Sequence, residues 1–358
     1  MRVFQTFILP EGLVAKYKLS FAAVNFSRNL ISGGGFDKVY SLVPTSVKGE
    51  LIVGCEDGYK LIYSSWRNKG GLLSKFAIYK EQFDLFKKVK KGDSLWTYNL
   101  NTMNGFLFLL LKYFKPSVKR NIILLDFTPA NKWYQKNAFF IKLINDADGI
   151  ICLSKSDLFK VKNIEELPGV VPANGNQNPL INNLSPDFLI SGMLGENISM
   201  LKSLLIPAFK QMPQYKLHIS GMAPDEDELK SLIKNIPNII YHGKVSLNEY
   251  FELLHSIPIL LSTRNPDYPE NKCNFPSKII EGLLHNRIII STLHYPQLKD
   301  VNYLEVSSKI DQFIKDLQGI MNKSSNVLLK YANQGTKVQN LFSPKIWNNT
   351  MTKIENRE

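Results

Sequence analysis

Short apolar runs rich in β-branched residues alternate with longer helical patterns along nearly all of the 358 residues. Strands separated by helices favour parallel sheets with helical crossovers, because parallel neighbours cannot be joined by a tight turn. The strands predicted in the first half lie near 3–9, 39–43, 51–54, 95–99, 121–127 and 149–153. The helices predicted there lie near 19–30, 82–90, 104–113 and 130–145.

The same alternation continues beyond a polar segment, 172–186, that contains NGNQNP and INNLSP. Strands are predicted there near 188–191, 216–220, 239–241, 259–262 and 288–291. Helices are predicted near 200–211, 225–234, 247–255 and 277–285. We therefore expect an α/β protein with two doubly wound domains, whose ligands bind at the carboxyl ends of the strands.

Composition sets further limits on the class of protein. The length suits two domains with separate cores, and 44% hydrophobic with 21% charged residues is ordinary for a soluble globular protein. Three scattered cysteines and an N-terminus without a secretory leader favour a cytoplasmic location. The longest apolar stretch, near 106–111, is too short to cross a bilayer.

Positive charge is concentrated in the first half. Residues 1–180 carry a net charge of +11, and the remainder carries +2. Lysines next to aromatic residues are conspicuous among Phe83, Phe86, Lys87, Lys88, Lys90 and Lys91. Such a field attracts an anionic partner, for which a membrane surface or a phosphorylated lipid is our main hypothesis. The alternatives are a solvated helix and a nucleic-acid surface.

Residues 273–292, CNFPSKIIEGLLHNRIIIST, contain the most specific pattern. Pro276 suits the first helical position, which leaves the N–H groups of Ser277 and Lys278 facing outward at the positive end of the helix dipole. That arrangement attracts a phosphate or diphosphate. Glu281, one turn further in, is placed to accept hydrogen bonds from sugar hydroxyls. Together these features predict a nucleotide-sugar site.

This segment, FPSKIIE followed by GLLHNRIIIST, resembles the donor-site signature of retaining glycosyltransferases of family 4, which have the GT-B fold. The resemblance implies that Glu281 holds the donor ribose and that Asn274 and Phe275 belong to the donor site. Cys273 occupies the position of the signature's first Glu, so the chain departs from the pattern there. Glu270 is close enough to substitute as a catalytic carboxylate.

The resemblance extends over most of the chain. FLISGMLGE, YKLHISGMA and NIIYHGKVSLNEYFELL follow the family's order in the second half, and ADGIICLSKSD at 147–157 matches more loosely. It implies two Rossmann-like domains facing each other across a cleft, an acceptor-side domain at 1–178 and a donor-binding domain at 179–341. LFSPKIWNNTMTKI resembles the terminal helix that crosses back, so residues 342–358 are expected to pack on the first domain.

Two glycine loops are candidates for contact with the donor. Gly192 and Gly195 follow a strand and precede a helix, so their backbone N–H groups can face phosphate or sugar. Gly12, after the first strand, lies where the family has an active-site loop, and a plain surface turn is the alternative. The run Gly33–Gly35 follows a helix instead, so we interpret it as a helix C-cap and turn.

The remaining candidates follow from the family's pattern. Relatives place an Arg and a Lys near Met193 and Met200, so the cations that we expect to neutralise the diphosphate are Lys202, Arg264 and Lys278, with ordinary surface bases as the alternative. Backbone groups around Val245 would read the nucleotide base, although Gly243 also suits a tight turn.

Asp126 and Thr128 end the apolar strand IILLDFTP, where a polar side chain lies close to the ligands of such folds. They are predicted to contact the reacting sugar or the acceptor, and helix N-capping is the alternative. The histidines and cysteines show no ligand spacing, and Asp-x-Asp and G-x-S-x-G are absent from the sequence. We therefore expect neither a metal, a cofactor nor serine hydrolase chemistry.

The resemblance to family 4 thus implies a hexosyltransferase-type glycosyltransferase that retains anomeric configuration. A nucleotide-diphosphate sugar would be its donor, and a lipid-linked glycan its acceptor, in surface polysaccharide assembly such as that of a capsule. It would work at the inner face of the cytoplasmic membrane as a peripheral protein and bind no nucleic acid. The alternatives are a sugar-nucleotide epimerase, a non-catalytic partner protein of the same fold, and a basic nucleic-acid binder.

Overall fold

The computed structural model describes residues 1–17, 19–43, 46, 58–125, 127, 136–173, 178–272 and 274–357. The predicted strand at 51–54 and the predicted site residues Asp126 and Thr128 lie outside this part of the chain. Contacts between residues divide the chain into two units. Unit 1 comprises Met1–Ala173, Cys273–Phe275 and Phe342–Glu358, and unit 2 comprises Asn174–Lys272 and Pro276–Leu341.

The described strands of unit 1 form a parallel sheet of seven, in the order β3-β2-β1-β4-β5-β6-β7. The chain starts in the middle of the sheet, moves to one edge and returns to the other side of β1, as in a doubly wound fold. The strands are β1 (Arg2–Thr6), β2 (Lys38–Ser41), β3 (Lys60–Leu61), β4 (Ser94–Tyr98), β5 (Lys119–Leu124), β6 (Gly149–Cys152) and β7 (Ile164–Glu166).

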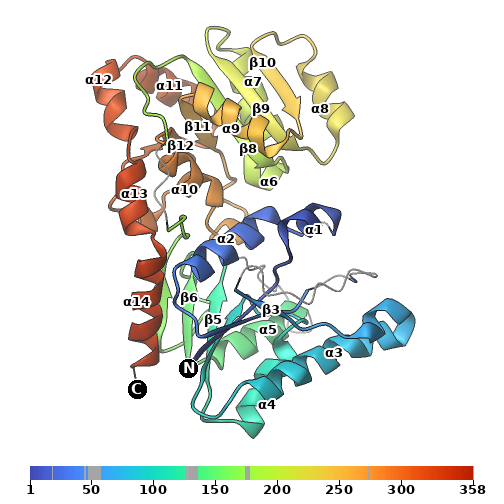
Figure 1. Cartoon of the computed structure of the whole chain (residues 1–358). Helices are drawn as coiled ribbons and strands as arrows, with labels where there is room; N and C mark the ends of the chain where they lie inside the picture. The colour runs from blue at the N-terminus through green and yellow to red at the C-terminus, as the bar shows by residue number, and fades with distance from the viewer. Residues whose placement is uncertain are drawn as a thin grey trace. The chain divides into compact units, whose positions relative to one another are not determined.

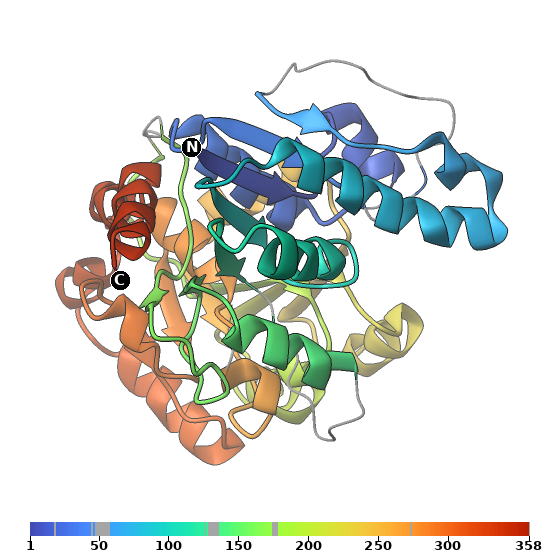
Figure 2. The same cartoon turned by 90° about the horizontal axis from the view of Figure 1, so that it is seen from below.

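Helices lie on both faces of this sheet (Figure 1). On one face α2 packs against α14, and on the other α4 packs against both α3 and α5 (Figures 1 and 2). The helices of unit 1 are α1 (Glu11–Lys16), α2 (Phe21–Ser32), η1 (Ser65–Lys69), α3 (Gly71–Lys88), α4 (Gly105–Phe114), α5 (Lys136–Asn145) and α14 (Pro344–Glu355).

The C-terminal helix α14 is held on unit 1 by buried polar contacts. The indole Nε1 of the fully buried Trp347 donates to the carbonyl of Gly169 at 2.8 Å, and the Trp96 indole donates to the Glu355 carboxylate at 2.7 Å. Gly33 forms the C-cap of α2 as predicted, and a Cβ there would lie 2.2 Å from Cβ of Pro344. The glycine run therefore ends α2 and also admits α14.

The described strands of unit 2 form a parallel sheet of six, in the order β10-β9-β8-β11-β12-β13. They are β8 (Asp187–Met193), β9 (Lys216–Met222), β10 (Ile239–Gly243), β11 (Ile259–Ser262), β12 (Ile288–Ser291) and β13 (Leu304–Glu305). The helices are α6 (Glu196–Ser199), η2 (Leu201–Leu205), α7 (Ile206–Lys210), α8 (Glu226–Ile233), α9 (Leu247–Ser256), η3 (Pro269–Lys272), α10 (Ser277–Leu284), η4 (Pro296–Leu298), α11 (Ile310–Met321), α12 (Ser325–Leu328), η5 (Leu329–Tyr331) and α13 (Gly335–Leu341).

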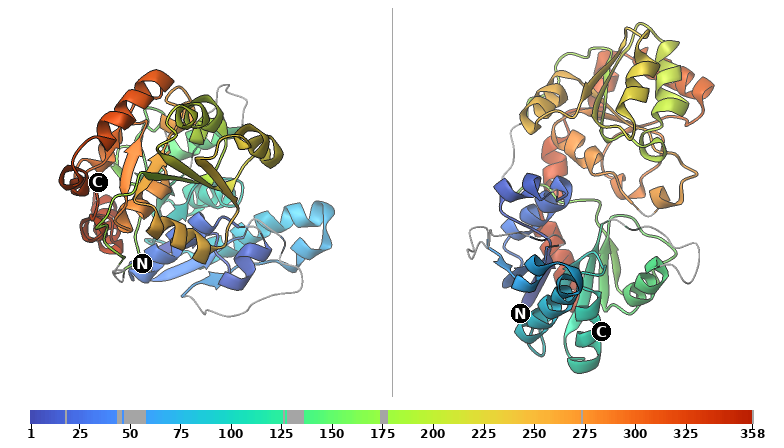
Figure 3. Two further views of the ribbon diagram at one scale, coloured as in Figure 1. Left: turned by 90° about the horizontal axis from the view of Figure 1, so that it is seen from above. Right: turned by 90° about the vertical axis from the view of Figure 1, so that its right-hand side faces the viewer.

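The core of unit 2 follows the alternation of its strands. Phe188, Ile190 and neighbouring residues of the same face pack against α7 and α11, while α10 covers the opposite face (Figure 3). Gly282 lets α10 approach the sheet closely, because a Cβ there would lie 2.8 Å from the side chains of Leu260 and Ile289. The prediction of two doubly wound domains is confirmed.

Several predicted elements need correction. The helix predicted at 82–90 is the end of α3, which begins at Gly71. The helix predicted at 200–211 is observed as η2, a π-helical stretch, followed directly by α7, and Met200, with its left-handed backbone (φ 48°), separates it from α6. The sequence interpretation missed the amphipathic helix α11. No helix among the described residues combines the length and the apolar character needed to cross a bilayer.

Candidate functional site

The candidate site lies at the carboxyl edge of the unit 2 sheet. Strand order reverses between β8 and β11, and ligands of doubly wound folds bind at such a switch point. The loop after β8 and the segment from β11 to α10 both start at this edge. Because the strands are parallel, the predicted glycine loop and the helix predicted to bind the diphosphate lie at the same edge of the unit 2 sheet.

Two glycines keep the end of β8 open. Gly192 and Gly221 are register partners at the ends of β8 and β9, with φ of 115° and 137°. A Cβ on Gly221 would lie 1.9 Å from the carbonyl oxygen of Gly192, whereas a Cβ on Gly192 would meet nothing within 4 Å. The backbone of Gly192 is thus uncovered, and a ligand can approach it closely. Gly192 lies within the strand, not in the loop that was predicted.

A carboxylate of the chain itself already binds backbone N–H groups just after this loop. Gly195 is the N-cap of the short helix α6, and the Glu196 carboxylate accepts hydrogen bonds from the backbone N–H groups of Lys202 and Ser203, both at 3.0 Å. The carboxylate satisfies donors that a phosphate would otherwise use. At the start of η2 these two backbone donors are therefore already satisfied within the chain.

α10 begins at Ser277, as the predicted range 277–285 has it, and Pro276 stands one residue before the first helical position predicted for it. Pro276 is the N-cap, with an extended backbone (φ −74°, ψ 113°), and its carbonyl accepts from the Ile279 N–H at 3.1 Å. No side chain in the described part of the chain caps this helix. The Ser277 and Lys278 amides lie at the positive end of the helix dipole, where the Ser277 side chain is exposed.

Three side chains meet one turn inside α10. Lys278 Nζ lies 2.5 Å from Glu281 Oε2 and 4.0 Å from the centroid of the Tyr250 ring, and the Tyr250 hydroxyl donates to the same Glu281 oxygen at 3.0 Å. Ser191, at the end of β8, donates to the Tyr250 hydroxyl at 3.5 Å. The cluster joins α9, α10 and β8. We call Tyr250, Lys278 and Glu281 the α10 triad.

Burial and charge set the protonation states of the triad. Burial, followed by the neighbouring Glu281, raises the pKa of Tyr250 to about 12, so its hydroxyl stays a donor at neutral pH. Burial opposes the charge of Lys278, but the Glu281 carboxylate and the Tyr250 hydroxyl together outweigh it and raise the pKa of the Lys278 amine. Their side chains remain partly exposed, 40% for Lys278 and 28% for Glu281. A cation and a hydroxyl acceptor are therefore both accessible to a ligand.

A second buried cluster supports the other end of α10. His285 follows the helix, its Nδ1 lies 2.8 Å from Nε2 of His255, and its ring stacks on Phe251 at 5.0 Å. Arg287 donates to three backbone carbonyls, those of His285, His255 and Pro179. Burial lowers the pKa of His285 to about 4 and that of Arg287 to about 10. These contacts hold α10 in place without forming a ligand site.

The segment between β11 and α10 is ordered by Asn271. Arg264 Nη1 donates to Asn271 Oδ1 at 3.0 Å, and the Asn271 amide donates to the carbonyls of Asn197 and Asn265. Arg264 thus lies at the carboxyl edge with a fixed guanidinium. Glu270, in η3, is partly buried and hydrogen-bonds to Tyr268, which raises the pKa of Tyr268.

Other predicted residues lie in different surroundings. The Lys202 amine forms an ion pair with Glu228 of α8 at the surface. Val245 follows β10 and is half-buried. Gly12 lies in the first turn of α1, so the predicted loop is a short helix there. That correction follows from the hydrogen bond of Leu13 N–H to the carbonyl of Pro10.

Asn274 and Phe275 belong to unit 1 by their contacts. The Asn274 side chain accepts from the Phe127 N–H at 2.8 Å and donates to the Phe127 carbonyl at 3.2 Å. Phe275 is buried, with 3% of its surface exposed. In this structure the Asn274 amide therefore binds the backbone of Phe127.

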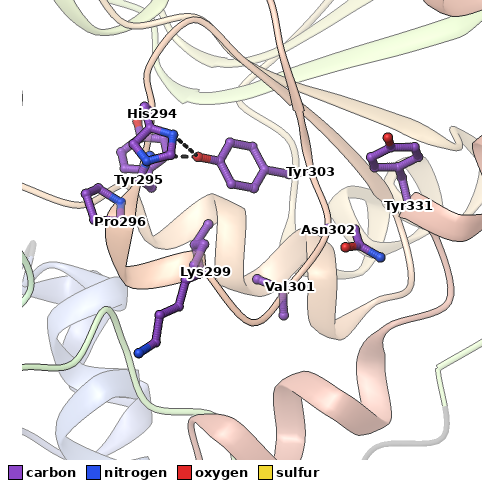
Figure 4. A pocket seen from close by; sticks show the side chains of 9 residues that line it. His294, Tyr295, Pro296, Lys299, Val301, Asn302, Tyr303 and Tyr331 are labelled. Carbon is purple, nitrogen blue, oxygen red and sulfur yellow. Dashed lines mark hydrogen bonds between the residues drawn. The ribbon is translucent and has the colours of Figure 1, made fainter.

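A separate pocket of about 240 Å³ lies beside the connection from β12 to β13 (Figure 4). Tyr303 and His294 are hydrogen-bonded at its rim, and Tyr331 lines it from another element. Its lining includes none of the predicted site residues. In the described part of the chain, no group of three or more His, Cys, Asp or Glu side chains is arranged to hold a metal ion.

The sequence interpretation missed Tyr250 and the histidine pair. Tyr250 lies one turn inside α9, whose start is fixed by a capping box between Ser246 and Glu249. The capping box is a readable signal, S-x-x-E before an apolar run, that fixes the start of the helix, and the spacing of Tyr250 and Leu254 would then have placed Tyr250 on the buried side. Nothing in the sequence indicated that this side faces Glu281.

Comparisons with known proteins show the fold. No protein-family model and no curated protein matches this sequence. Among solved structures, HepE of Anabaena in complex with UDP and glucose is 14% identical, with a TM-score of 0.64 over 98% of each chain. Sucrose-phosphate synthase from Thermosynechococcus elongatus is 12% identical, with a TM-score of 0.66 over 99% of this chain and 98% of the other.

TarM of S. aureus, in a complex that includes UDP, is 15% identical, with a TM-score of 0.55. That match covers 77% of this chain and 58% of TarM, so the chain spans less than two thirds of TarM. At these identities the likeness concerns the fold. The two parallel-sheet units have the GT-B fold, as the sequence predicted.

Proposed function

We propose that this chain is a GT-B glycosyltransferase that transfers a sugar from a nucleotide-diphosphate sugar. The observation that carries the proposal is the start of α10, where backbone amide donors and Lys278 lie one turn from Glu281. The amides and the amine suit a diphosphate, and the carboxylate suits the ribose hydroxyls. HepE and TarM, which share the fold, are described in complexes with UDP.

The chemistry requires stabilisation of two developing charges. A departing nucleoside diphosphate carries negative charge, which the α10 amides, the helix dipole and Lys278 would stabilise without reorganisation. The sugar becomes oxocarbenium-like, and Glu270 is the carboxylate that we propose near it, with Asp126 and Thr128 as further candidates for contacts with the sugar or acceptor. We propose that Arg264 adds a second cation and that no metal or cofactor takes part.

The finer assignment rests on the sequence resemblance. We propose a retaining, hexosyltransferase-type enzyme similar to family 4, acting in the assembly of a surface polysaccharide such as a capsule. Its acceptor would be a lipid-linked glycan, and the enzyme would associate peripherally with the inner face of the cytoplasmic membrane. The basic character of the first half of the chain, with a net charge of +11 over residues 1–180, supports an anionic partner of this kind.

The test is thermal unfolding against a panel of nucleotide-diphosphate sugars. A true donor at 100 times its dissociation constant adds about 2.7 kcal/mol of stability. Glu281→Ala should abolish most of this response, and sugar transfer from the best donor should be detectable as a released nucleoside diphosphate. A response that Glu281→Ala leaves intact would refute the site. Donor binding without any transfer or epimerisation would favour a non-catalytic partner protein.

A further inference from the structure

Helix α3 carries a second apolar stripe on its solvent-facing side. A surface helix usually has one such stripe, which faces the core. In α3 that role belongs to the buried side that carries Ala77, Glu81 and Leu85. On the opposite side of α3, four large apolar side chains recur at spacings of four, three and four residues and point away from the core. They are Leu72 (71% exposed), Phe76 (58%), Tyr79 (51%) and Phe83 (42%).

The stripe continues onto the end of α4. The rings of Phe83 and Phe86 stack with centroids 5.9 Å apart, and Phe86 meets Phe114 edge-on at 6.4 Å. Phe114 and Tyr113 are 67% and 69% exposed. In unit 1, α3 extends beyond the neighbouring helix α4 (Figure 2). We call this surface the α3 face. It consists of Leu72, Phe76, Tyr79, Phe83, Phe86, Tyr113 and Phe114.

Lysines border the aromatic side chains. Lys87 Nζ lies 4.6 Å from the centroid of the Phe83 ring. The acidic residues of α3 are already paired: Asp84 contacts Lys80, and Glu81 is buried against Arg67. The exposed lysines on or next to the helix are Lys69, Lys75, Lys80, Lys87, Lys88, Lys90 and Lys91.

We propose that the α3 face docks unit 1 on an anionic lipid bilayer. At a membrane interface, aromatic rings are buried at the boundary between headgroups and acyl chains. The lysines would remain at headgroup level and contact lipid phosphates. Contiguous exposed apolar surface rimmed by polar groups marks an interaction site. A second copy of this chain is a poorer partner, because two lysine-rich faces repel each other. The inference rests on the membrane association proposed above and assigns it to named side chains.

The experiment is cosedimentation of the full chain with phosphatidylcholine vesicles, either alone or with about one third phosphatidylglycerol. Wild type should bind the anionic vesicles and not the neutral ones. Phe76→Ser/Phe83→Ser should weaken binding about tenfold or more, since it removes two of the rings that would enter the interface. Lys75→Gln/Lys87→Gln, two exposed lysines on either side of the stripe, should weaken it about fivefold per lysine. Leu232→Ser, which removes a 44% exposed side chain from α8 of unit 2, is the matched control.

The outcomes separate this inference from the donor-site proposal. All variants should unfold like wild type and keep their response to the nucleotide sugar, because none touches the α10 triad. No binding of wild type to anionic vesicles would overturn the inference, as would equal losses in Phe76→Ser/Phe83→Ser and Leu232→Ser. A wild-type dimer that the Phe variant dissociates would also overturn it, in favour of a contact between copies.

Discussion

Replacing Lys278 by Met tests the α10 triad most directly. The change keeps most of the side-chain volume over the Tyr250 ring but removes the amine that lies 2.5 Å from Glu281. The pair is partly exposed, with 40% of the Lys278 side chain accessible, so screening limits its value to about 0–1 kcal/mol. The free energy of unfolding without ligand should therefore change by about 1 kcal/mol or less.

The effect on the donor should be larger. A hydrogen bond from a charged amine to a diphosphate contributes about 1.5–3 kcal/mol. Its loss should therefore raise the dissociation constant of the donor about ten- to hundredfold. At a donor concentration of 100 times the wild-type constant, ligand stabilisation should fall from about 2.7 to about 0.4–1.4 kcal/mol. The measurement is thermal unfolding of both proteins over a series of donor concentrations.

Lys230→Met is the matched control. Lys230 also pairs with a carboxylate one turn away, Glu226 at 2.9 Å, but it lies on α8, away from the α10 triad. This variant should respond to the donor as wild type does. If Lys278→Met also keeps the full donor response, the amine does not face the diphosphate and the electrostatic part of the proposal is wrong.

Three further predictions concern stability. Arg67→Met should lower the free energy of unfolding in urea by about 3–5 kcal/mol, because it leaves the 1% exposed Glu81 carboxylate without its cation. Adding Glu81→Gln should recover part of the loss, and a cost under about 1 kcal/mol would contradict this prediction. Burial holds His285 neutral in the folded state and lowers its pKa from 6.5 to about 4. Its effect on the free energy of unfolding should therefore be absent above pH 6.5 and reach a loss of about 3 kcal/mol as the pH drops to 4. His285→Gln should flatten this part of the curve of stability against pH. Gly33→Ala should destabilise by about 1–3 kcal/mol through its clash with Pro344, whereas Gly319→Ala in α11, where a Cβ meets nothing within 4 Å, should stabilise slightly by thermal unfolding.

Local sequence was sufficient for the strands and helices nearest the candidate site. The predicted strands at 259–262 and 288–291 match β11 and β12 at both ends, because each is a short apolar run between helices. The start of α10 was predicted to within one residue from Pro276, and Glu281 lies one turn inside it as expected. Boundaries failed where a helix depended on distant packing, as for the N-terminal half of α3.

What the sequence by itself determined is the fold class and one end of the site. Alternation of apolar runs, and the order of Pro276, Ser277 and Glu281, are properties of neighbours along the chain. Only the tertiary structure decided that Tyr250 of α9 meets Glu281, that the Asn274 amide binds the Phe127 backbone, and that Glu196 occupies the start of η2. These contacts join residues whose separation along the chain carries no periodic signal, so they arise from how the helices pack on the sheet and not from local preference.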